Sequence, residues 1–201
     1  MVARGHTVIA AAPRDVYSAQ VQVELLAMGV TYAAVDIARG GMNPWQDMKS
    51  YSELIRLFRT NLPDVVLAYT AKPVIYGGMA ARKVGGVQFY PMMTGLGYAF
   101  TESNGIRRKA VFALTKQLYR RALASASATF FQNPDDEALF RALKIAPRRV
   151  PSFRVNGSGV DLAAFPQKPL PDSPVFLMMA RLIVYKGVRE YVAAAKIVKE
   201  R

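Results

Sequence analysis

Apolar and polar positions follow two different periods along the chain, and these periods predict strands and helices in alternation. Short apolar runs predict strands over residues 7–11, 30–35, 64–69, 87–92, 128–132, 153–155 and 174–180. Apolar residues at helical spacing predict helices over residues 16–28, 47–59, 73–84, 107–125, 133–143 and 188–199. Strands separated by helices of this length favour an α/β fold, in which a parallel sheet carries helices on both faces.

Ligands of parallel α/β sheets bind beyond the carboxyl ends of the strands. The loops that follow the predicted strands are therefore the first places to look for a site. They are residues 13–16, 69–73, 93–101, 132–135 and 181–187.

A proline-rich segment near the C-terminus divides the predicted elements into two groups. We expect a domain over residues 1–156, a linker over 157–173 and the start of a second domain over 174–201. One strand and one helix cannot bury a core of their own, so residues 174–201 are expected to be the first βα unit of a larger domain.

The composition excludes several kinds of site. The 201 residues are 52% hydrophobic and 20% charged, which is typical of a globular protein. There is no cysteine, and His6 is the single histidine, so disulfides, a zinc site and a histidine-based triad are not expected. The uncharged stretch 84–101 contains four glycines and Pro91, and it therefore predicts strand and loop rather than a membrane-spanning helix.

The net charge of +13 is concentrated in the middle of the chain, where residues 101–150 carry ten basic and four acidic side chains. At 100° per residue, the predicted helix 107–125 places Lys109, Lys116 and Arg120 on one stripe. The opposite stripe is apolar and is expected to face the core: Val111, Leu114, Leu118 and Ala122.

Two interpretations of this basic helix stay open. It is either a solvated face or a surface that docks onto anionic lipid head groups, with Phe112 and Tyr119 dipping into the interface. The membrane-facing candidates are Arg107, Arg108, Lys109, Lys116 and Arg120. No nucleic-acid-binding motif accompanies the charge, so a nucleic-acid partner is not expected.

A second basic feature follows the predicted strand 174–180. Arg181 and Lys186 flank a loop, and Gly187 opens a helix, so side-chain cations and helix N–H groups can point at one diphosphate. The alternative is two solvated cations beside a turn.

Several motifs together resemble a known family. They are Asn156–Asp161, Phe165, Pro174–Leu182 and Lys186-Gly187, preceded by Arg4–Val8, Pro63–Val66, Lys72–Gly77, Thr94–Phe100 and Phe130–Asp135. The pattern resembles the family 4 glycosyltransferases, which have two Rossmann-like domains (the GT-B type). It is most similar to the subgroup that builds bacterial capsule, O-antigen or lipid-linked oligosaccharides.

The resemblance implies a retaining, metal-independent enzyme without a cofactor, which transfers a sugar from a UDP- or GDP-sugar to a polyprenyl-linked or saccharide acceptor. It implies a cytoplasmic protein, peripheral on the inner face of the membrane. Residues 1–156 would be the acceptor-side domain. The family's first strand and its downstream Glu-x7-Glu segment have no counterpart here, so we expect an inactive fragment truncated at both ends. The alternative is a non-catalytic basic module that binds an anionic membrane or a polyanion.

The resemblance also assigns roles to residues. Arg181, Lys186 and Gly187 would bind the donor diphosphate. The acceptor-side cleft would be lined by Lys72, Thr94, Gly95, Gly97 and Tyr98. The interdomain residues would be Gly157, Ser158, Gly159 and Asp161. For Lys72, a cation near a helix end is an equal alternative.

Overall fold

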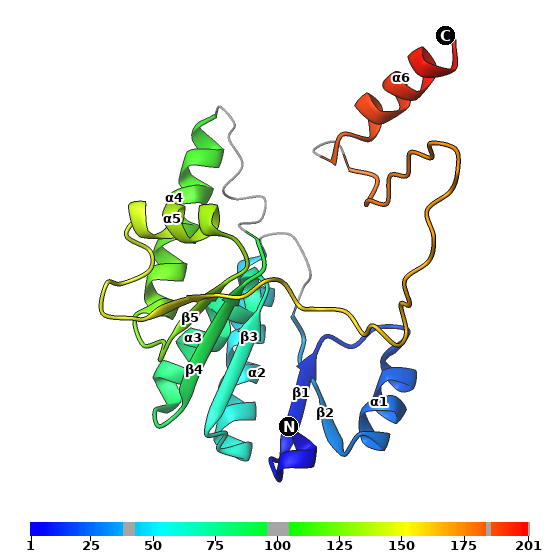
Figure 1. Cartoon of the computed structure of the whole chain (residues 1–201). Helices are drawn as coiled ribbons and strands as arrows, with labels where there is room; N and C mark the ends of the chain where they lie inside the picture. Colours follow the sequence, from blue (N-terminus) through cyan, green and yellow to red (C-terminus); the bar gives the residue numbers. More distant parts are fainter. Residues whose placement is uncertain (38–42, 96–104, 184–185, 201) are drawn as a thin grey trace. The chain divides into compact units, whose positions relative to one another are not determined.

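All strands in the described part of the chain pair in parallel, and they form two sheets (Figure 1). A computed structural model describes residues 1–37, 43–95, 105–183 and 186–200. One sheet has the order β1-β2 and the other the order β3-β4-β5-β6. The strands are β1 (Val8–Ala12), β2 (Val30–Ala34), β3 (Val65–Tyr69), β4 (Gln88–Met93), β5 (Thr129–Phe131) and β6 (Ser152–Arg154).

Helices connect the strands in sequence order, and the predicted α/β fold with a parallel sheet flanked by helices is confirmed. The helices are α1 (Ser18–Ala27), α2 (Pro44–Asn61), α3 (Ala71–Val84), α4 (Ile106–Leu123), α5 (Pro134–Ala142) and α6 (Val188–Lys199), with a short 3-10 turn over Val2–Arg4. The chain divides into two compact units, Met1–Gly159 and Val160–Arg201, and the strands all lie in the first.

Asparagine caps fix the starts of two helices. The side chain of Asn133 accepts a hydrogen bond from the backbone N–H of Asp136 at 2.7 Å, at the start of α5. Asn43 caps α2 in the same way, and proline follows each cap at the first helical position, where it loses no hydrogen bond. Because of this cap, α2 begins three residues before the predicted residue 47.

The core of the first unit lies between the four-stranded sheet and its helices. Phe89 and Phe131 are fully buried on β4 and β5, and Phe140 of α5 packs its ring edge-on against Phe131 with 5.6 Å between ring centroids. Tyr119 of α4 contacts Phe140 in the same manner at 5.4 Å. These contacts hold α4 and α5 against the sheet.

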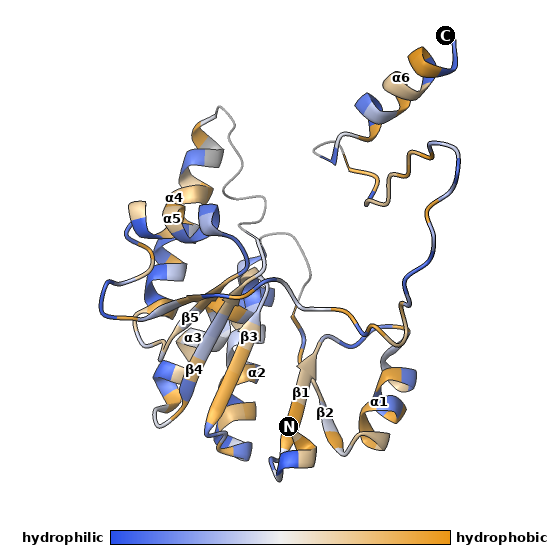
Figure 2. Cartoon of the chain, viewed as in Figure 1, coloured by the Kyte–Doolittle hydropathy of each residue, from blue (hydrophilic) through white to orange (hydrophobic). Residues whose placement is uncertain are grey.

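The two faces of β3 differ in cover. Ala68 is buried on the face that packs against α3, whereas Val65, Leu67 and Tyr69 on the other face are about half exposed. The strand is apolar along its length, while α2, α4 and α6 mix apolar and polar positions (Figure 2). Helices were predicted on both faces of the sheet. Within the described residues, a helix packs against only one face of β3.

The second unit has one regular element, the helix α6, among its described residues. The predicted helix 188–199 is confirmed, but the predicted strand 174–180 is wrong: this segment has no regular secondary structure, and Phe176 and Leu177 are exposed. A strand needs a hydrogen-bonded neighbour, and none lies beside it in the described part of this unit. Instead the Tyr191 hydroxyl of α6 donates to the Phe176 carbonyl at 2.7 Å.

Candidate functional site

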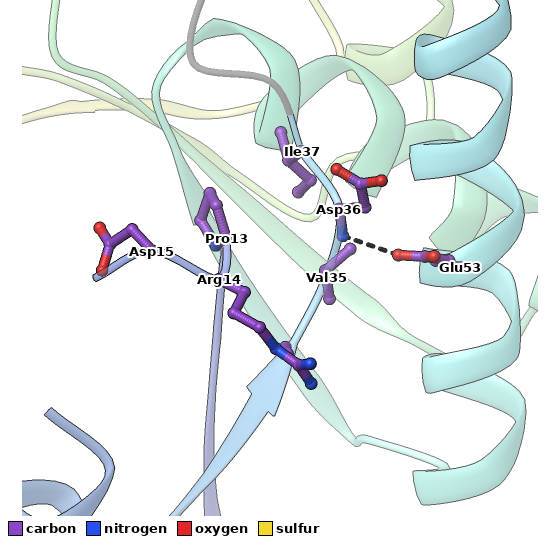
Figure 3. A pocket seen from close by; sticks show the side chains of 8 residues that line it. Pro13, Arg14, Asp15, Val35, Asp36, Ile37 and Glu53 are labelled. Atoms are coloured by element: carbon purple, nitrogen blue, oxygen red, sulfur yellow. Dashed lines mark hydrogen bonds between the residues drawn. The ribbon is translucent and has the colours of Figure 1, made fainter. Parts of the chain in front are cut away.

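A cavity of about 560 Å³ lies at the carboxyl ends of β1 and β2 (Figure 3). Two strand-end segments and one position on α2 line it: Pro13, Arg14, Asp15, Ala34, Val35, Asp36, Ile37 and Glu53. This is the edge of a parallel sheet where ligands bind, and the volume suits a small molecule.

Hydrogen bonds tie the β2 end of the cavity to α2. The backbone N–H of Asp36 donates to the Glu53 carboxylate at 2.7 Å, and Lys49 Nζ donates to Asp36 Oδ2 at 2.7 Å. The buried hydroxyl of Ser50 donates to the Asp36 carbonyl. Lys49 lowers the pKa of the Asp36 carboxyl by this hydrogen bond and by its charge, so Asp36 is an anion at neutral pH.

The β1 end of the cavity is held by Tyr32 and by a local turn. The Tyr32 hydroxyl donates to the Pro13 carbonyl at 3.2 Å. The Asp15 carboxylate accepts from the backbone N–H of Tyr17 at 3.0 Å, and the Asp15 N–H donates to Ser18 Oγ at 2.7 Å. The cavity thus presents fixed carboxylates together with the exposed Arg14.

Strain marks the turn from β3 into α3. Thr70 has φ 69° and ψ 158°, a region that essentially glycine alone occupies, and its side chain makes no cap hydrogen bond. Two residues later, Lys72 Nζ donates to Asp47 Oδ1 of α2 at 2.8 Å, with both side chains 17% exposed. Burial raises the pKa of Tyr76, and its hydrogen bond to Asp47 adds to the rise.

Lys72 therefore lies at the carboxyl end of β3, as predicted, but its ammonium is paired. It occupies the first turn of α3, where a cation opposes the helix dipole, and Asp47 offsets that charge.

The carboxyl ends of β4 and β5 meet beside the linker. Thr94 and Gly95 follow β4 and are exposed. Gln132 Nε2 lies 4.0 Å from Met92 Sδ and 3.5 Å from Ser158 Oγ, so it links β4 to the segment after β6. The predicted cleft residues Gly97 and Tyr98 lie outside the described residues.

The predicted interdomain residues surround the boundary between the two units. Gly157 and Gly159 have φ of 74° and 75°, which glycine adopts without steric cost. After the boundary, the Asp161 carboxylate accepts from the backbone N–H of Ala163 at 2.9 Å and closes a turn.

The predicted diphosphate residues lie in the second unit. Arg181 and Lys186 are both exposed. Gly187 is the N-cap of α6 in the left-handed conformation, with φ 71°. The helix thus begins where the sequence predicted, with its first N–H groups beside Lys186 in the chain.

On α4 the structure changes the predicted faces. Tyr119 is 2% exposed, so the prediction that it reaches a membrane interface is wrong; Leu114 is 57% exposed, so its predicted place in the core is also wrong. Arg120 Nε and Nη2 donate to the carbonyls of Lys144 and Leu143, each at 2.8 Å, and so cap the end of α5.

The other cations of α4 differ in exposure. Lys109 is exposed and Lys116 is half-buried. The side chains of Arg107 and Arg108 lie outside the described part of the structure. Within the described ranges, no three His, Cys, Asp or Glu side chains gather as metal ligands would, and no helix is long and apolar enough to cross a membrane.

Residues of these strand-end networks that sequence reasoning missed include Asp36, Asp47, Lys49, Glu53 and Thr70. Lys49 and Glu53 are four residues apart on α2, and this spacing predicts that they share one charged face of the helix. It does not predict that this face contacts the end of β2. The positive φ of Thr70 has no sequence signal, because threonine rarely adopts it.

Comparison with known proteins places the chain in a family. The chain is 22% identical over 203 aligned residues to a Campylobacter jejuni protein named N,N'-diacetylbacillosaminyl-diphospho-undecaprenol alpha-1,3-N-acetylgalactosaminyltransferase; the alignment covers 94% of this chain and 52% of that protein. The chain thus spans about half the length of this relative. The crystal structure of Acinetobacter baumannii MurG superposes with a TM-score of 0.48 at 18% identity, over 84% of this chain and 41% of MurG, a similarity that says nothing about substrate. Residues 1–154 match the glycosyl transferase 4-like domain, and the chain belongs to this glycosyltransferase family.

Proposed function

We propose that the chain is the acceptor-side part of a glycosyltransferase that moves a sugar from a UDP- or GDP-sugar to a polyprenyl-linked or saccharide acceptor. The observation that carries the proposal is the match of residues 1–154 to the glycosyl transferase 4-like domain. The Campylobacter relative is named for an acceptor linked through a diphosphate to undecaprenol, which supports a lipid-linked acceptor. The protein would then work at the inner face of the cytoplasmic membrane.

The proposed donor site lies in residues 174–201. Arg181 and Lys186 would hold the donor diphosphate, and the N-terminus of α6 behind Gly187 would add backbone N–H groups. Cations placed at a leaving diphosphate stabilise the charge that develops as the glycosidic bond breaks, so no metal is required. We propose retention of configuration on the family resemblance alone.

The proposed acceptor site lies at the carboxyl ends of the strands of the first unit. Thr94 and Gly95, with Gly97 and Tyr98 after them, would contact the acceptor, because they follow β4 and the first two are exposed. Lys72 would contribute only if it leaves Asp47, since its Nζ is engaged at 2.8 Å. Gly157, Ser158, Gly159 and Asp161 would form the connection over 157–173 between the two domains.

Binding of a soluble acceptor analogue tests this proposal. The probe is a farnesyl-diphosphate-linked N-acetylhexosamine, titrated calorimetrically into the 201-residue chain, with farnesyl diphosphate and the free sugar as controls. We expect saturable binding that is at least tenfold tighter than for either control. Thr94→Trp should abolish it, whereas Thr60→Trp, an exposed site on α2, should not.

A transfer assay accompanies the titration. Because the chain spans about half the Campylobacter relative, we expect no sugar transfer from UDP- or GDP-sugars by the chain alone. Transfer would overturn the inactive-fragment part of the proposal. No preference for the linked saccharide over both controls would overturn the acceptor-side assignment and favour a non-catalytic basic module.

A further inference from the structure

The cavity at the carboxyl ends of β1 and β2 lies apart from both proposed substrate sites (Figure 3). The proposed acceptor residues Thr94 and Gly95 follow β4 of the other sheet, and the proposed donor residues lie in the second unit. With a volume of about 560 Å³, the cavity is therefore a separate place where a small molecule can bind.

The charge of the cavity walls differs from that of the whole chain. Three carboxylates and one guanidinium line the cavity, those of Asp15, Asp36, Glu53 and Arg14, whereas the chain carries a net charge of +13. Lys49 keeps Asp36 anionic by its hydrogen bond and by its charge. Because three carboxylates in one small cavity repel a phosphate group, we do not expect a second diphosphate site here.

Hydrogen-bond acceptors and donors lie on different sides of the cavity. Figure 3 shows Asp36 and Glu53 together on the α2 side and Arg14 on the β1 side. Glu53 accepts from the Asp36 N–H through Oε2, which leaves Oε1 for a ligand, and no hydrogen bond or ion pair engages Arg14 within the described residues. Carboxylates only accept hydrogen bonds and a guanidinium only donates them. The matching ligand therefore carries hydroxyls, which do both, whereas an ammonium group only donates and is repelled by Arg14.

Apolar side chains complete the walls of the cavity. Pro13 is half-buried and Ala34 is exposed, whereas Val35 and Ile37 are 2% and 8% exposed and belong to the core. A sugar ring presents C–H groups on its faces and hydroxyls at its rim, so it matches a wall that sets apolar residues beside polar ones. The volume is large enough for a mono- or disaccharide.

Internal hydrogen bonds fix these walls in place. Ser50 and Glu53 of α2 both bind the backbone of Asp36, and the Tyr32 hydroxyl binds the Pro13 carbonyl. Walls that are already ordered lose little conformational entropy when a ligand binds, which favours recognition of a small, weakly binding molecule.

The helix α2 also links the cavity to the end of β3. Asp47 in its first turn pairs with Lys72 at 2.8 Å, and Glu53 lines the cavity. These two acids are six residues apart in α2, or about 9 Å along the helix axis. One helix therefore positions both the cavity and the strand end that leads into α3.

We infer that this cavity binds a neutral saccharide, whose hydroxyls donate to Asp36 and Glu53 and accept from Arg14, while one ring face contacts Pro13 and Ala34. The inference deepens the proposed function and rests on it for the role of the site. The cavity would hold a sugar of a saccharide acceptor that lies away from the sugar being extended.

An NMR titration tests the class of ligand. The isotopically labelled 201-residue chain is titrated with N,N'-diacetylchitobiose as the neutral saccharide, inorganic phosphate as the anion and ethanolamine as the cation. The signal followed is the Asp36 backbone N–H, whose hydrogen bond to Glu53 makes it sensitive to both carboxylates. We expect a saturable shift with chitobiose alone. A larger response to phosphate or ethanolamine, or no saturable response to chitobiose, would overturn the inference.

Two pairs of variants test the contacts. Arg14→Met removes a charged donor and should weaken chitobiose binding about tenfold, whereas Arg82→Met, at an exposed site near the end of α3, should leave it unchanged. Ala34→Trp should fill the cavity and abolish the shift, whereas Thr31→Trp, exposed on β2 outside the cavity, should not. Far-ultraviolet circular dichroism checks that each variant folds, and Arg14→Met alone decides the matter if Ala34→Trp does not. Equal affinity of Arg14→Met and Arg82→Met would contradict a saccharide held by Arg14.

The result is separable from the test of the proposed function. Thr94→Trp, which should abolish binding of the farnesyl-linked sugar, should leave the chitobiose shift at Asp36 intact. If chitobiose shifts the Gly95 N–H and not that of Asp36, the acceptor site is supported and the cavity site is refuted. Chitobiose binding at Asp36 without any binding of the farnesyl-linked sugar supports the saccharide site and removes its role in acceptor recognition.

Discussion

Two adjacent glycines of α3 should respond in opposite directions to the same substitution. A Cβ built at Gly78 would lie 2.8 Å from the Ala122 carbonyl oxygen of α4 and 2.7 Å from the Phe89 ring. A Cβ at Gly77 would meet the same ring at 3.6 Å and Ala68 Cβ at 3.8 Å, which are ordinary contacts. The close approach of α3 to α4 therefore requires a glycine at position 78 but not at position 77.

The magnitude follows from two opposing effects. Alanine in place of glycine inside a helix is favourable by about 1 kcal/mol through helix propensity. At Gly78 the contacts are several tenths of an ångström too short, Phe89 is fully buried and the carbonyl belongs to helix backbone, so overpacking should cost about 2–3 kcal/mol. We expect Gly78→Ala to lower the free energy of unfolding by about 1–2 kcal/mol, and Gly77→Ala to raise it by about 0.5–1 kcal/mol.

Urea denaturation followed by far-ultraviolet circular dichroism measures both values. A fluorescence readout is less useful because the single tryptophan, Trp45, is 87% exposed. The two variants should differ by about 1.5–3 kcal/mol, or roughly 3–12 °C in Tm for a chain of this size. If Gly78→Ala is as stable as Gly77→Ala, the close approach of α3 to α4 is wrong, and the packing that anchors α4 must be revised.

Three further measurements probe the strand-end networks. The pKa of the Asp36 carboxyl, followed by NMR, should lie below 3.8 and return toward 3.8 in Lys49→Met. Because the folded-state pKa is lowered, the stabilisation from Asp36 should be present above pH 3.8 and lost as the pH falls through the folded-state pKa. An unchanged pKa of Asp36 in Lys49→Met would refute the pairing. Thr70→Gly should raise the free energy of unfolding by about 1 kcal/mol in a urea titration, since it relieves a positive φ without losing a hydrogen bond; a loss of stability would contradict the strained turn. A double-mutant cycle of Asp47→Ala and Lys72→Met should give a coupling of about 1–3 kcal/mol, and a value near zero would show that the 2.8 Å pair is not formed in solution.

The sequence predicts the elements of the first unit well, because each apolar run and each helical repeat is bounded by turn residues. Gly29 and Gly85 directly follow the predicted helices 16–28 and 73–84, and both have a positive φ. The errors fall where a partner decides the structure. The run 174–180 is as apolar as β3, yet it forms no strand, since pairing requires a neighbour that periodicity cannot supply.

The networks at the strand ends were less predictable than the strands. Position in sequence shows that Lys72 and Asp36 follow strands, and topology then places each at the carboxyl edge of its own sheet. Their partners, Asp47 and Lys49, both come from α2, and sequence gives no measure of how that helix is rotated. A charged residue at a strand end is therefore a candidate for binding only after its own ion pairs are known, and Lys72 is the case in point.

The rotation of α4 shows why its exposed face could not be predicted from periodicity. Periodicity places Lys109, Lys116 and Arg120 opposite Val111, Leu114, Leu118 and Ala122, and it implies that this second set is the core face. The buried residues Tyr119, Ala122 and Leu123 show that the core face is rotated toward the basic stripe. Arg120 consequently reaches the end of α5, and Leu114 turns outward. The exposed side of α4 thus changes from a purely basic stripe to a face that also includes Ile106, Ala110, Ala113 and Leu114, because the rotation of a helix against its sheet depends on packing that periodicity does not show.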